Sequence, residues 1–161
     1  MQNSSIASVP TSFAWSGGTA GGDFNASYDI WFSSRRPAPG SYSEAVSGFV
    51  MIWLYQPPSR TPIGSQQRTA TIARHTWNVW VGTRGTDAIG TDGPNRLVVS
   101  YVATDSPVAV LSFDLNLFIM DAAANGISSA WYLTDVFGGF QIWTGSDAVG
   151  LACTDFTCVV H

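Results

Sequence analysis

Residues 47–55 read Ser-Gly-Phe-Val-Met-Ile-Trp-Leu-Tyr, an apolar run with Ser and Gly before it and Gln and two prolines after it. β-Branched and aromatic side chains favour a β-strand, and Gly and Pro mark its ends. Because successive side chains of a strand point to opposite faces, Phe49, Met51 and Trp53 share one face. The run therefore predicts a strand that gathers three large apolar side chains on one side.

Shorter runs of the same kind recur along the chain, separated by Gly, Pro, Ser and Asp. They predict strands at 12–16, 24–33, 47–55, 69–73, 76–82, 96–104, 131–137, 139–144 and 149–160. Loops are expected at 35–41, 56–62 and 82–94. Many short strands with turn signals at near-regular spacing are typical of an antiparallel sandwich or jelly roll. The predicted fold class is all-β.

One segment, residues 112–125, departs from the strand pattern. Ser112 suits a helix N-cap, Asp114 falls in the first turn, and Gly126 follows the end. The pattern predicts a single α-helix of about three turns. Its spacing turns four side chains toward the body of the protein, namely Phe113, Leu117, Met120 and Ala124.

The composition fits one domain over residues 1–161, since 45% of the residues are hydrophobic and 11% are charged. The net charge is -4, with seven arginines and no basic cluster beyond Arg35-Arg36, so we expect no nucleic-acid partner. No apolar stretch is long enough for a membrane span, and the first five residues lack the features of a signal peptide. The expected location is cytoplasmic, or secreted if a leader has been removed.

Cys153 and Cys158 lie five residues apart, without the neighbours that a zinc site needs. A turn between them would allow a bridge, whereas one straight strand would place them on opposite faces as free thiols. Both alternatives stay open. We expect no metal and no cofactor.

Several segments together carry a resemblance to a known family. The run Phe49–Leu54, followed by Thr61-Pro62-Ile63-Gly64-Ser65, resembles the hallmark segment of family 12 of the glycoside hydrolases, the jelly-roll endo-β-1,4-glucanases and xyloglucanases. Further segments are similar to strands of that family, at 26–32, 76–82 and 132–145. The resemblance runs from about Ile6 to the end, and it implies a concanavalin-like β-sandwich with one helix.

The resemblance does not extend to the catalytic residues. Retaining glucanases need two carboxyl groups about 5 to 5.5 Å apart, one a nucleophile and one a general acid/base. Phe49 occupies the position of the family's nucleophile, and Gln141 occupies that of its acid/base. A phenyl ring cannot attack an anomeric carbon, and an amide does not donate a proton near neutral pH. We therefore expect a pseudoenzyme, not a standard retaining glucanase.

Other carboxylates offer a partial replacement at most. Asp29 matches a family aspartate that hydrogen-bonds the nucleophile, so it is the expected cleft carboxylate. Glu44, the single glutamate, would need a register shift of five residues. Asp135 has the same strand parity as Gln141, but a bend or bulge at Gly138-Gly139 would break that parity.

The aromatic residues divide into two groups. The resemblance places Trp31, Trp53 and Trp143 on the cleft face with Phe49 and Met51, where they would bind a ligand. Phe in place of Glu makes this cleft more apolar. Three other tryptophans are expected in the core or between the sheets, namely Trp15, Trp77 and Trp80.

The resemblance also implies that strands which the family has before Ile6 are absent here, about the first third of the usual domain. Uncovered sheet edges have to be paired or buried, so we expect a homo-oligomer, most simply a two-fold dimer.

Three functions remain open. The first is non-hydrolytic binding of β-glucan or another carbohydrate. The second is an intracellular isomerase, lyase or cyclase that acts on an apolar small molecule, with Asp29 as acid/base and Gln141 as hydrogen-bond donor. The third is a glycosidase that uses a displaced carboxylate. The first needs the fewest assumptions and is preferred.

Overall fold

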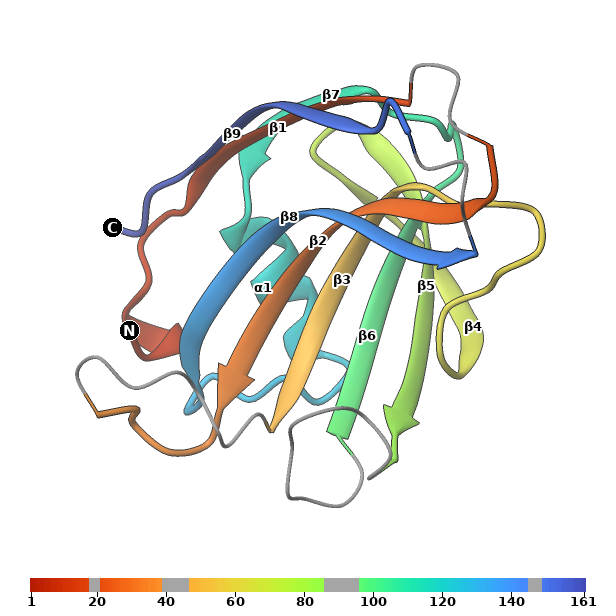
Figure 1. The fold of residues 1–161 in the computed structure, drawn as a ribbon. Coiled ribbons are helices and arrows are strands. Elements are labelled where there is room, and N and C mark those ends of the chain that lie inside the picture. The colour runs from red at the N-terminus through yellow and green to blue at the C-terminus, as the bar shows by residue number, and fades with distance from the viewer. Residues whose placement is uncertain (18–20, 39–46, 86–95, 145–148) are drawn as a thin grey trace.

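Two β-sheets form the molecule in a computed structural model that describes residues 1–17, 21–38, 47–85, 96–144 and 149–161. The larger sheet has the order β4-β5-β6-β3-β2-β8 and the smaller one β7-β1-β9 (Figure 1). The larger sheet comprises β2 (Asp23–Ser33), β3 (Gly48–Tyr55), β4 (Ser65–Ile72), β5 (His75–Arg84), β6 (Arg96–Ala103) and β8 (Tyr132–Thr144). The smaller one comprises β1 (Pro10–Ser16), β7 (Val110–Asp114) and β9 (Ala152–Cys158).

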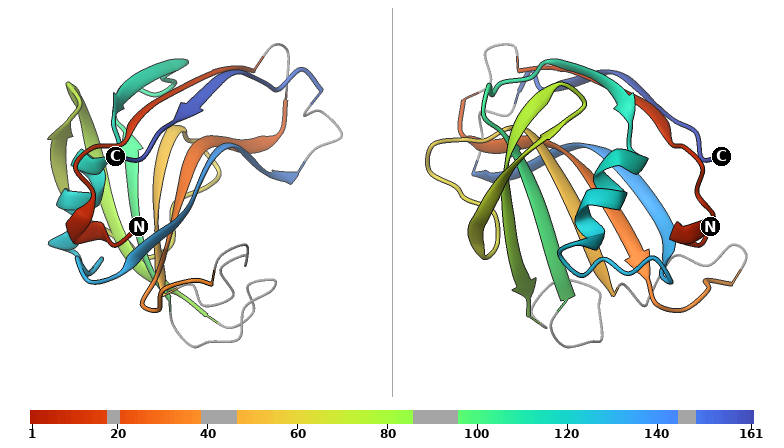
Figure 2. Two further views of the ribbon diagram at one scale, coloured as in Figure 1. Left: turned by 90° about the vertical axis from the view of Figure 1, so that its left-hand side faces the viewer. Right: turned by 180° about the vertical axis from the view of Figure 1, so that it is seen from behind.

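Two helical segments complete the described fold, the 3-10 turn η1 (Asn3–Ser5) and the helix α1 (Asn116–Ala123). Seen from behind, α1 lies across the same face of the larger sheet that the smaller sheet covers (Figure 2). Its Phe118 ring packs edge-on against Trp77 and Tyr101 of that sheet. The main core therefore lies between the larger sheet on one side and α1 with the smaller sheet on the other.

The register of β2 and β3 gives this sheet two distinct faces. Asp29 pairs with Met51 and Trp31 with Phe49, so these side chains lie on one face. The alternate residues enter the core on the other face, and all are fully buried: Tyr28, Ile30, Phe32, Val50, Ile52 and Leu54. Burying such side chains contributes about 1.5–3 kcal/mol each, so these strands supply much of the driving force for folding.

The all-β prediction and the jelly-roll sandwich are confirmed, with differences in individual elements. The predicted strands at 131–137 and 139–144 are one strand, β8, because β2 pairs with it continuously across Gly138 and Gly139. The strand β7 was not predicted. Residues 82–84, expected in a loop, belong to β5 because they pair with β6.

The helix is shorter than the predicted range 112–125, and it turns a different side toward the core. Residues 112–114 continue β7, because Ser112 and Phe113 pair with β1. Leu117 and Met120, expected to face inward, are 46% and 67% exposed. The helix buries Asn116, Phe118, Ile119 and Ala122 instead. The prediction was wrong because it counted the apolar stripe from Phe113, which lies in β7, and that count selects Leu117 and Met120.

Several smaller predictions are also decided. Trp15 and Trp77 lie in the core, as expected, and their indole N–H groups donate to the carbonyl oxygens of Val108 and Ile72. Cys153 and Cys158 are free thiols on the single strand β9. Among the described residues, no helix is long and apolar enough to cross a membrane.

Candidate functional site

The face of the larger sheet that points away from the core carries a cleft of about 310 Å³. Strands β2, β3, β5 and β8 contribute to it, together with the segment that follows β3. The lining residues are Asp29, Trp31, Phe49, Met51, Trp53, Arg60, Thr61, Pro62, Ile63, Arg84, Gln141 and Trp143. All seven site residues predicted from the sequence are among them, so the structure brings them together in one cavity.

The floor of the cleft is a second apolar cluster, separate from the main core. Phe49, Met51 and Trp53 are 7%, 7% and 2% exposed, and they pack with Val98 and Val102 of β6. Strand parity explains the arrangement, because these positions alternate with the core residues of the same strands. The cleft is thus a preformed apolar surface.

Aromatic rings extend this floor on both sides. The Trp31 and Phe49 ring centroids are 6.3 Å apart, and those of Trp53 and Trp143 are 5.8 Å apart. Trp80, predicted in the core or between the sheets, packs against this cluster and not in the main core, and it does not line the cleft. The reason is the β5–β6 register, which sets Trp80 opposite Ser100, while its neighbour Val79 enters the core.

One wall of the cleft is the segment Arg60–Ile63, which a close backbone contact holds in place. Gly64 has φ +90°, and a Cβ there would lie 2.0 Å from the Val81 carbonyl oxygen. Only glycine fits such a position without strain. The contact ties this segment to β5 and so places Arg60 at the cleft.

Arg60 is held between two partners. Its Nε lies 3.4 Å from a carboxylate oxygen of Asp23, and its guanidinium carbon lies 5.4 Å from the centroid of the Trp143 ring. The second contact has the geometry of a cation–π interaction. Sequence reasoning missed Arg60, although it directly precedes the Thr61–Ser65 segment, because nothing local shows that this segment folds over the cleft.

Within the described part of the chain, Asp29 is the one carboxylate that lines the cleft. Burial raises its pKa to about 6, while a hydrogen bond from the Ser27 hydroxyl and the charge of Arg84 act in the opposite direction. A carboxyl group with this pKa exchanges its proton near neutral pH, which suits general acid/base chemistry or a charge-dependent contact.

Gln141 lies at the exposed rim of the cleft, on β8. Its register partner is Asn25, whose side-chain oxygen accepts a hydrogen bond from the Gln141 backbone N–H at 3.0 Å. This fixes the strand and leaves the side-chain amide free to face a ligand. An amide here can donate and accept hydrogen bonds, but it is not a proton donor in catalysis.

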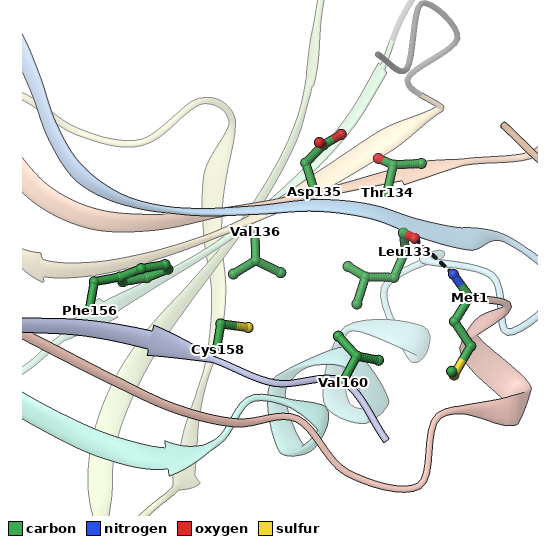
Figure 3. Close-up of a pocket in the computed structure, with 8 residues that line it drawn as sticks. All are labelled: Met1, Leu133, Thr134, Asp135, Val136, Phe156, Cys158 and Val160. Carbon is green, nitrogen blue, oxygen red and sulfur yellow. Dashed lines mark hydrogen bonds between the residues drawn. The ribbon is translucent and has the colours of Figure 1, made fainter. Parts of the chain in front are cut away.

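Two further carboxylates were considered from the sequence. Asp135 pairs with Trp31, and no register shift separates it from Gln141, so the parity that a bend would have broken is intact. Figure 3 shows its carboxylate on the side of β8 away from Leu133 and Val136. It shares the cleft face of the sheet but does not line the cavity. Glu44 lies outside the described residues.

Several polar atoms on the cleft face are buried without a hydrogen-bond partner in the described structure. They are the indole N–H groups of Trp31 and Trp53, the Asn25 amide nitrogen and the Ser100 hydroxyl. Buried donors are nearly always satisfied, so these groups need partners that the described residues do not supply. The described residues contain no group of three or more His, Cys, Asp or Glu side chains suited to a metal.

The two-sheet β-sandwich is the jelly-roll fold of solved family 12 glycoside hydrolases, one of which has a TM-score of 0.82 and 33% identity. The chain belongs to glycosyl hydrolase family 12, whose family model matches residues 2–161.

Relatives support this membership. A probable cellulase, Cel12b, of Mycobacterium tuberculosis is 33% identical over 157 residues, which are 97% of this chain and 93% of that protein. The xyloglucan-specific endo-β-1,4-glucanase A of Emericella nidulans is 34% identical over 91% of this chain and 56% of its own length. The solved endoglucanase Cel12A from Rhodothermus marinus has a TM-score of 0.79 and 34% identity, covering 100% of this chain.

The chain covers only part of the length of some of these relatives. The chain spans 65% of the Rhodothermus marinus structure and about half of the fungal glucanase.

Proposed function

We propose that this protein binds a segment of a β-1,4-linked glucan in its aromatic cleft without hydrolysing it. The names of its relatives, a cellulase and a xyloglucan-specific glucanase, support the ligand class. The cleft supports it as well, because flat aromatic side chains such as Trp31, Trp53 and Trp143 suit the apolar faces of sugar rings.

The observation that carries the proposal is the carboxylate inventory of the cleft. Both the retaining and the inverting mechanism need two carboxyl groups. Asp29 is the single one among the lining residues that the structure describes. Phe49 and Gln141 occupy the positions at which the family resemblance expects glutamates. With one acid among the described lining residues, the cleft offers a surface for a sugar but not, in that part of the chain, the second carboxyl group that either displacement mechanism requires.

Calorimetric titration with cellotetraose and with a xyloglucan oligosaccharide tests the proposal, followed by measurement of reducing ends in the same samples. We expect saturable binding with intact oligosaccharide. New reducing ends that disappear in Asp29→Asn would contradict the non-hydrolytic proposal. Absence of binding at millimolar ligand would contradict the carbohydrate ligand.

Restoring the two acids gives a sharper test. The double variant Phe49→Glu/Gln141→Glu should release reducing ends from cellotetraose, because it returns a carboxyl group to each expected catalytic position. The matched control is Phe49→Gln, which leaves amides of the same shape at both positions. Activity in the control would show that another group does the chemistry. An inactive but folded double variant would contradict the assignment of these two positions.

A second candidate function is favoured by the environment of Asp29. A carboxyl group with a pKa of about 6 beside an apolar floor suits proton transfer on an apolar small molecule, with Gln141 as a hydrogen-bond donor. This is the isomerase, lyase or cyclase alternative. It gains support if the titration shows no oligosaccharide binding while an apolar fluorescent probe binds, and if Asp29→Asn leaves that binding intact.

A glycosidase with a displaced carboxylate needs Asp135 as its second acid, because it shares a face with Asp29. This alternative requires that Asp29→Asn and Asp135→Asn each abolish the release of reducing ends. It has less support than binding because Asp135 does not line the cavity.

We also propose that the protein forms a homodimer through β8. Both sheets end side by side, at β8 and β9, and the space of about 600 Å³ between them is lined by apolar side chains that include Leu133, Val136, Phe156 and Val160 (Figure 3). The thirteen residues of β8 contain a single charge, that of Asp135. A long edge strand with so little charge readily pairs with another, and an antiparallel β8–β8 contact about a two-fold axis is self-complementary.

Light scattering measures the mass in solution, and a dimer is expected. Ile142→Lys on β8, where the side chain is 48% exposed, should yield monomers. Val110→Lys on β7, 65% exposed, is the matched control and should remain dimeric. A wild-type monomer would contradict the proposal.

A further inference from the structure

We propose that a recess at Gly139 receives the hydroxymethyl group of a glucose unit and so makes the cleft select a β-1,4-glucan over a β-1,4-xylan. A xylan has the same backbone linkage, but its sugar units lack this group. The inference rests on the proposed carbohydrate-binding function and names the part of the ligand that is recognised. It follows from the two adjacent glycines of β8 and from the polar groups beside them.

The recess has a volume of about 140 Å³ and adjoins the cleft, because Asp29 and Gln141 line both cavities. Its other lining residues are Ser27, Phe137, Gly138, Gly139 and Phe140. Gly139 pairs with Ser27 in the β2–β8 register, so its missing side chain leaves a gap on the cleft face of the sheet. Phe137 and Gln141 lie two positions away on either side and project to the same face. The recess is the space between these two side chains.

The two adjacent glycines differ in what a side chain would meet. A Cβ at Gly138 would lie 2.5 Å from the Phe156 ring, so close packing against β9 explains this glycine. A Cβ at Gly139 would meet no described atom within 4 Å beyond its chain neighbours. Glycine weakens the interior of a strand, because it loses more conformational freedom on folding than other residues do. Packing does not require glycine at position 139, so the feature that this glycine provides is the open space.

The side of the recess formed by β2 is polar. Ser27 is buried, and its hydroxyl donates a hydrogen bond to Asp29 Oδ1 at 3.2 Å. The second carboxylate oxygen, Oδ2, accepts no hydrogen bond from the described residues, although Arg84 interacts with the carboxylate through its charge. A ligand hydroxyl in the recess can therefore donate to Oδ2, and hydrogen bonds to a charged group are stronger than neutral ones.

The hydroxymethyl group of a glucan suits this recess in size and in polarity. The recess has the volume of about four or five water molecules, at roughly 30 Å³ each, so a group of one carbon and one oxygen fits. Its methylene carbon would contact the Phe137 ring, which lies 5.9 Å from the Trp31 ring between centroids, and its hydroxyl would reach Asp29. Successive units of a β-1,4-linked chain are flipped relative to one another, so every second unit directs this group to the side of the recess.

The test compares two tetrasaccharides with the same β-1,4 backbone, cellotetraose and xylotetraose, which differ only in their hydroxymethyl groups. Calorimetry gives both dissociation constants for the wild-type protein and for Gly139→Ala and Gly139→Val, which fill the recess in two steps. Gly17→Ala is the matched control, because a Cβ at Gly17, beyond the end of β1, makes an ordinary 3.5 Å contact with the Trp15 ring. We expect the wild type to bind cellotetraose at least about tenfold more tightly, as is typical for one extra group in a pocket.

The ratio of the two dissociation constants should fall toward one in Gly139→Val, because cellotetraose loses its contact while xylotetraose keeps its affinity. Gly139→Ala should give an intermediate ratio, and Gly17→Ala should keep the wild-type ratio. Thermal melting should show both Gly139 variants to be at least as stable as the wild type, since other residues favour a strand more than glycine does.

Three outcomes would contradict the inference. Equal binding of the two tetrasaccharides by the wild type would overturn it and leave the proposed function standing. An unchanged ratio in folded Gly139→Val would overturn the assignment to the recess. If neither ligand binds, the proposed function itself fails, and the inference fails with it.

Discussion

The two faces of strands β2 and β3 are built from alternating residues of the same segments, yet they differ in one respect. Both contain large apolar side chains that are almost fully buried, such as Ile52 at 0% and Met51 at 7% exposure. In the core, the Tyr28 hydroxyl accepts a hydrogen bond from Thr11, and the Trp77 indole N–H has a carbonyl partner. On the cleft face, the Trp31 and Trp53 indoles have none. Between these two faces, burial does not mark the difference, whereas the unsatisfied indole donors of Trp31 and Trp53 do.

The largest expected effect is a difference in the free energy of unfolding between substitutions on the two faces. Ile52→Ala removes a core side chain between the sheets and should lower the free energy of unfolding by about 3 kcal/mol, within the usual range for such a cavity. Met51→Ala, one residue away, should cost less because water can enter the cleft. Urea unfolding of the two variants measures the difference. Equal losses of unfolding free energy in the two variants would contradict the distinction between core and cleft.

A second test uses pH, because Asp29 is the buried carboxylate of the cleft face. Its pKa is raised from 3.8 to about 6, so between these values the unfolded chain releases a proton that the folded chain retains. The contribution of Asp29 to stability is therefore greatest below pH 4 and falls as the pH rises to 6. Asp29→Asn should remove this fall and be more stable than the wild type at pH 7, by up to about 3 kcal/mol. Thermal unfolding of the wild type and of Asp29→Asn across this pH range measures the difference in stability. A difference that stays constant with pH would contradict the prediction.

A third comparison sets two tryptophans against each other. Trp143 extends the cleft floor beneath Arg60, whereas Trp131 packs against the main core. Trp143→Ala should weaken oligosaccharide binding about tenfold with little change in melting temperature, since the loss of one aromatic contact is worth about 1 kcal/mol. Trp131→Ala should lower the melting temperature and leave oligosaccharide binding nearly unchanged. Calorimetry gives the affinity and thermal melts give the melting temperature of both variants. If the two variants change in the same way, Trp143 and Trp131 do not differ in function.

The smallest expected effect concerns Ser27, whose hydroxyl donates to Asp29 at 3.2 Å. This hydrogen bond favours the charged carboxylate, so Ser27→Ala should raise the pKa of Asp29 above about 6 by less than about one unit. Carbon-detected NMR titration of the aspartate carboxyls reports the shift directly. A pKa that stays constant or falls would show that the hydroxyl does not stabilise the ionised form.

The cleft was only partly accessible to sequence reasoning. The period-2 alternation of Phe49, Met51 and Trp53 placed them on one face, because strand geometry is local. The family resemblance added Asp29 and Gln141. Arg60 and Arg84 were missed, since each reaches the cleft through a contact between segments distant in sequence, the Gly64 approach to β5 and the β5–β6 register.

Helices and strands with a strong sequence pattern were predicted correctly. The predictions were wrong where a local turn or capping pattern competed with pairing to a distant strand. The Gly138-Gly139 pair suggested an interruption, but pairing with β2 carries β8 straight through it. The helix began later than its capping signals indicated, because pairing with β1 holds residues 112 and 113 in a strand. In both cases hydrogen bonds to a distant strand outweighed a local preference.

The sequence by itself determined the all-β class, the family and the identities of the residues at positions 29, 49 and 141. These follow from composition, alternation and motif order, which are properties of neighbouring residues along the chain. The tertiary structure alone decided that Trp80 packs against the apolar cluster under the cleft, that burial raises the pKa of Asp29 to about 6, and that two arginines line the site. Burial, charge and unsatisfied donors depend on what other strands bring nearby, so they exist only once the sheets have assembled.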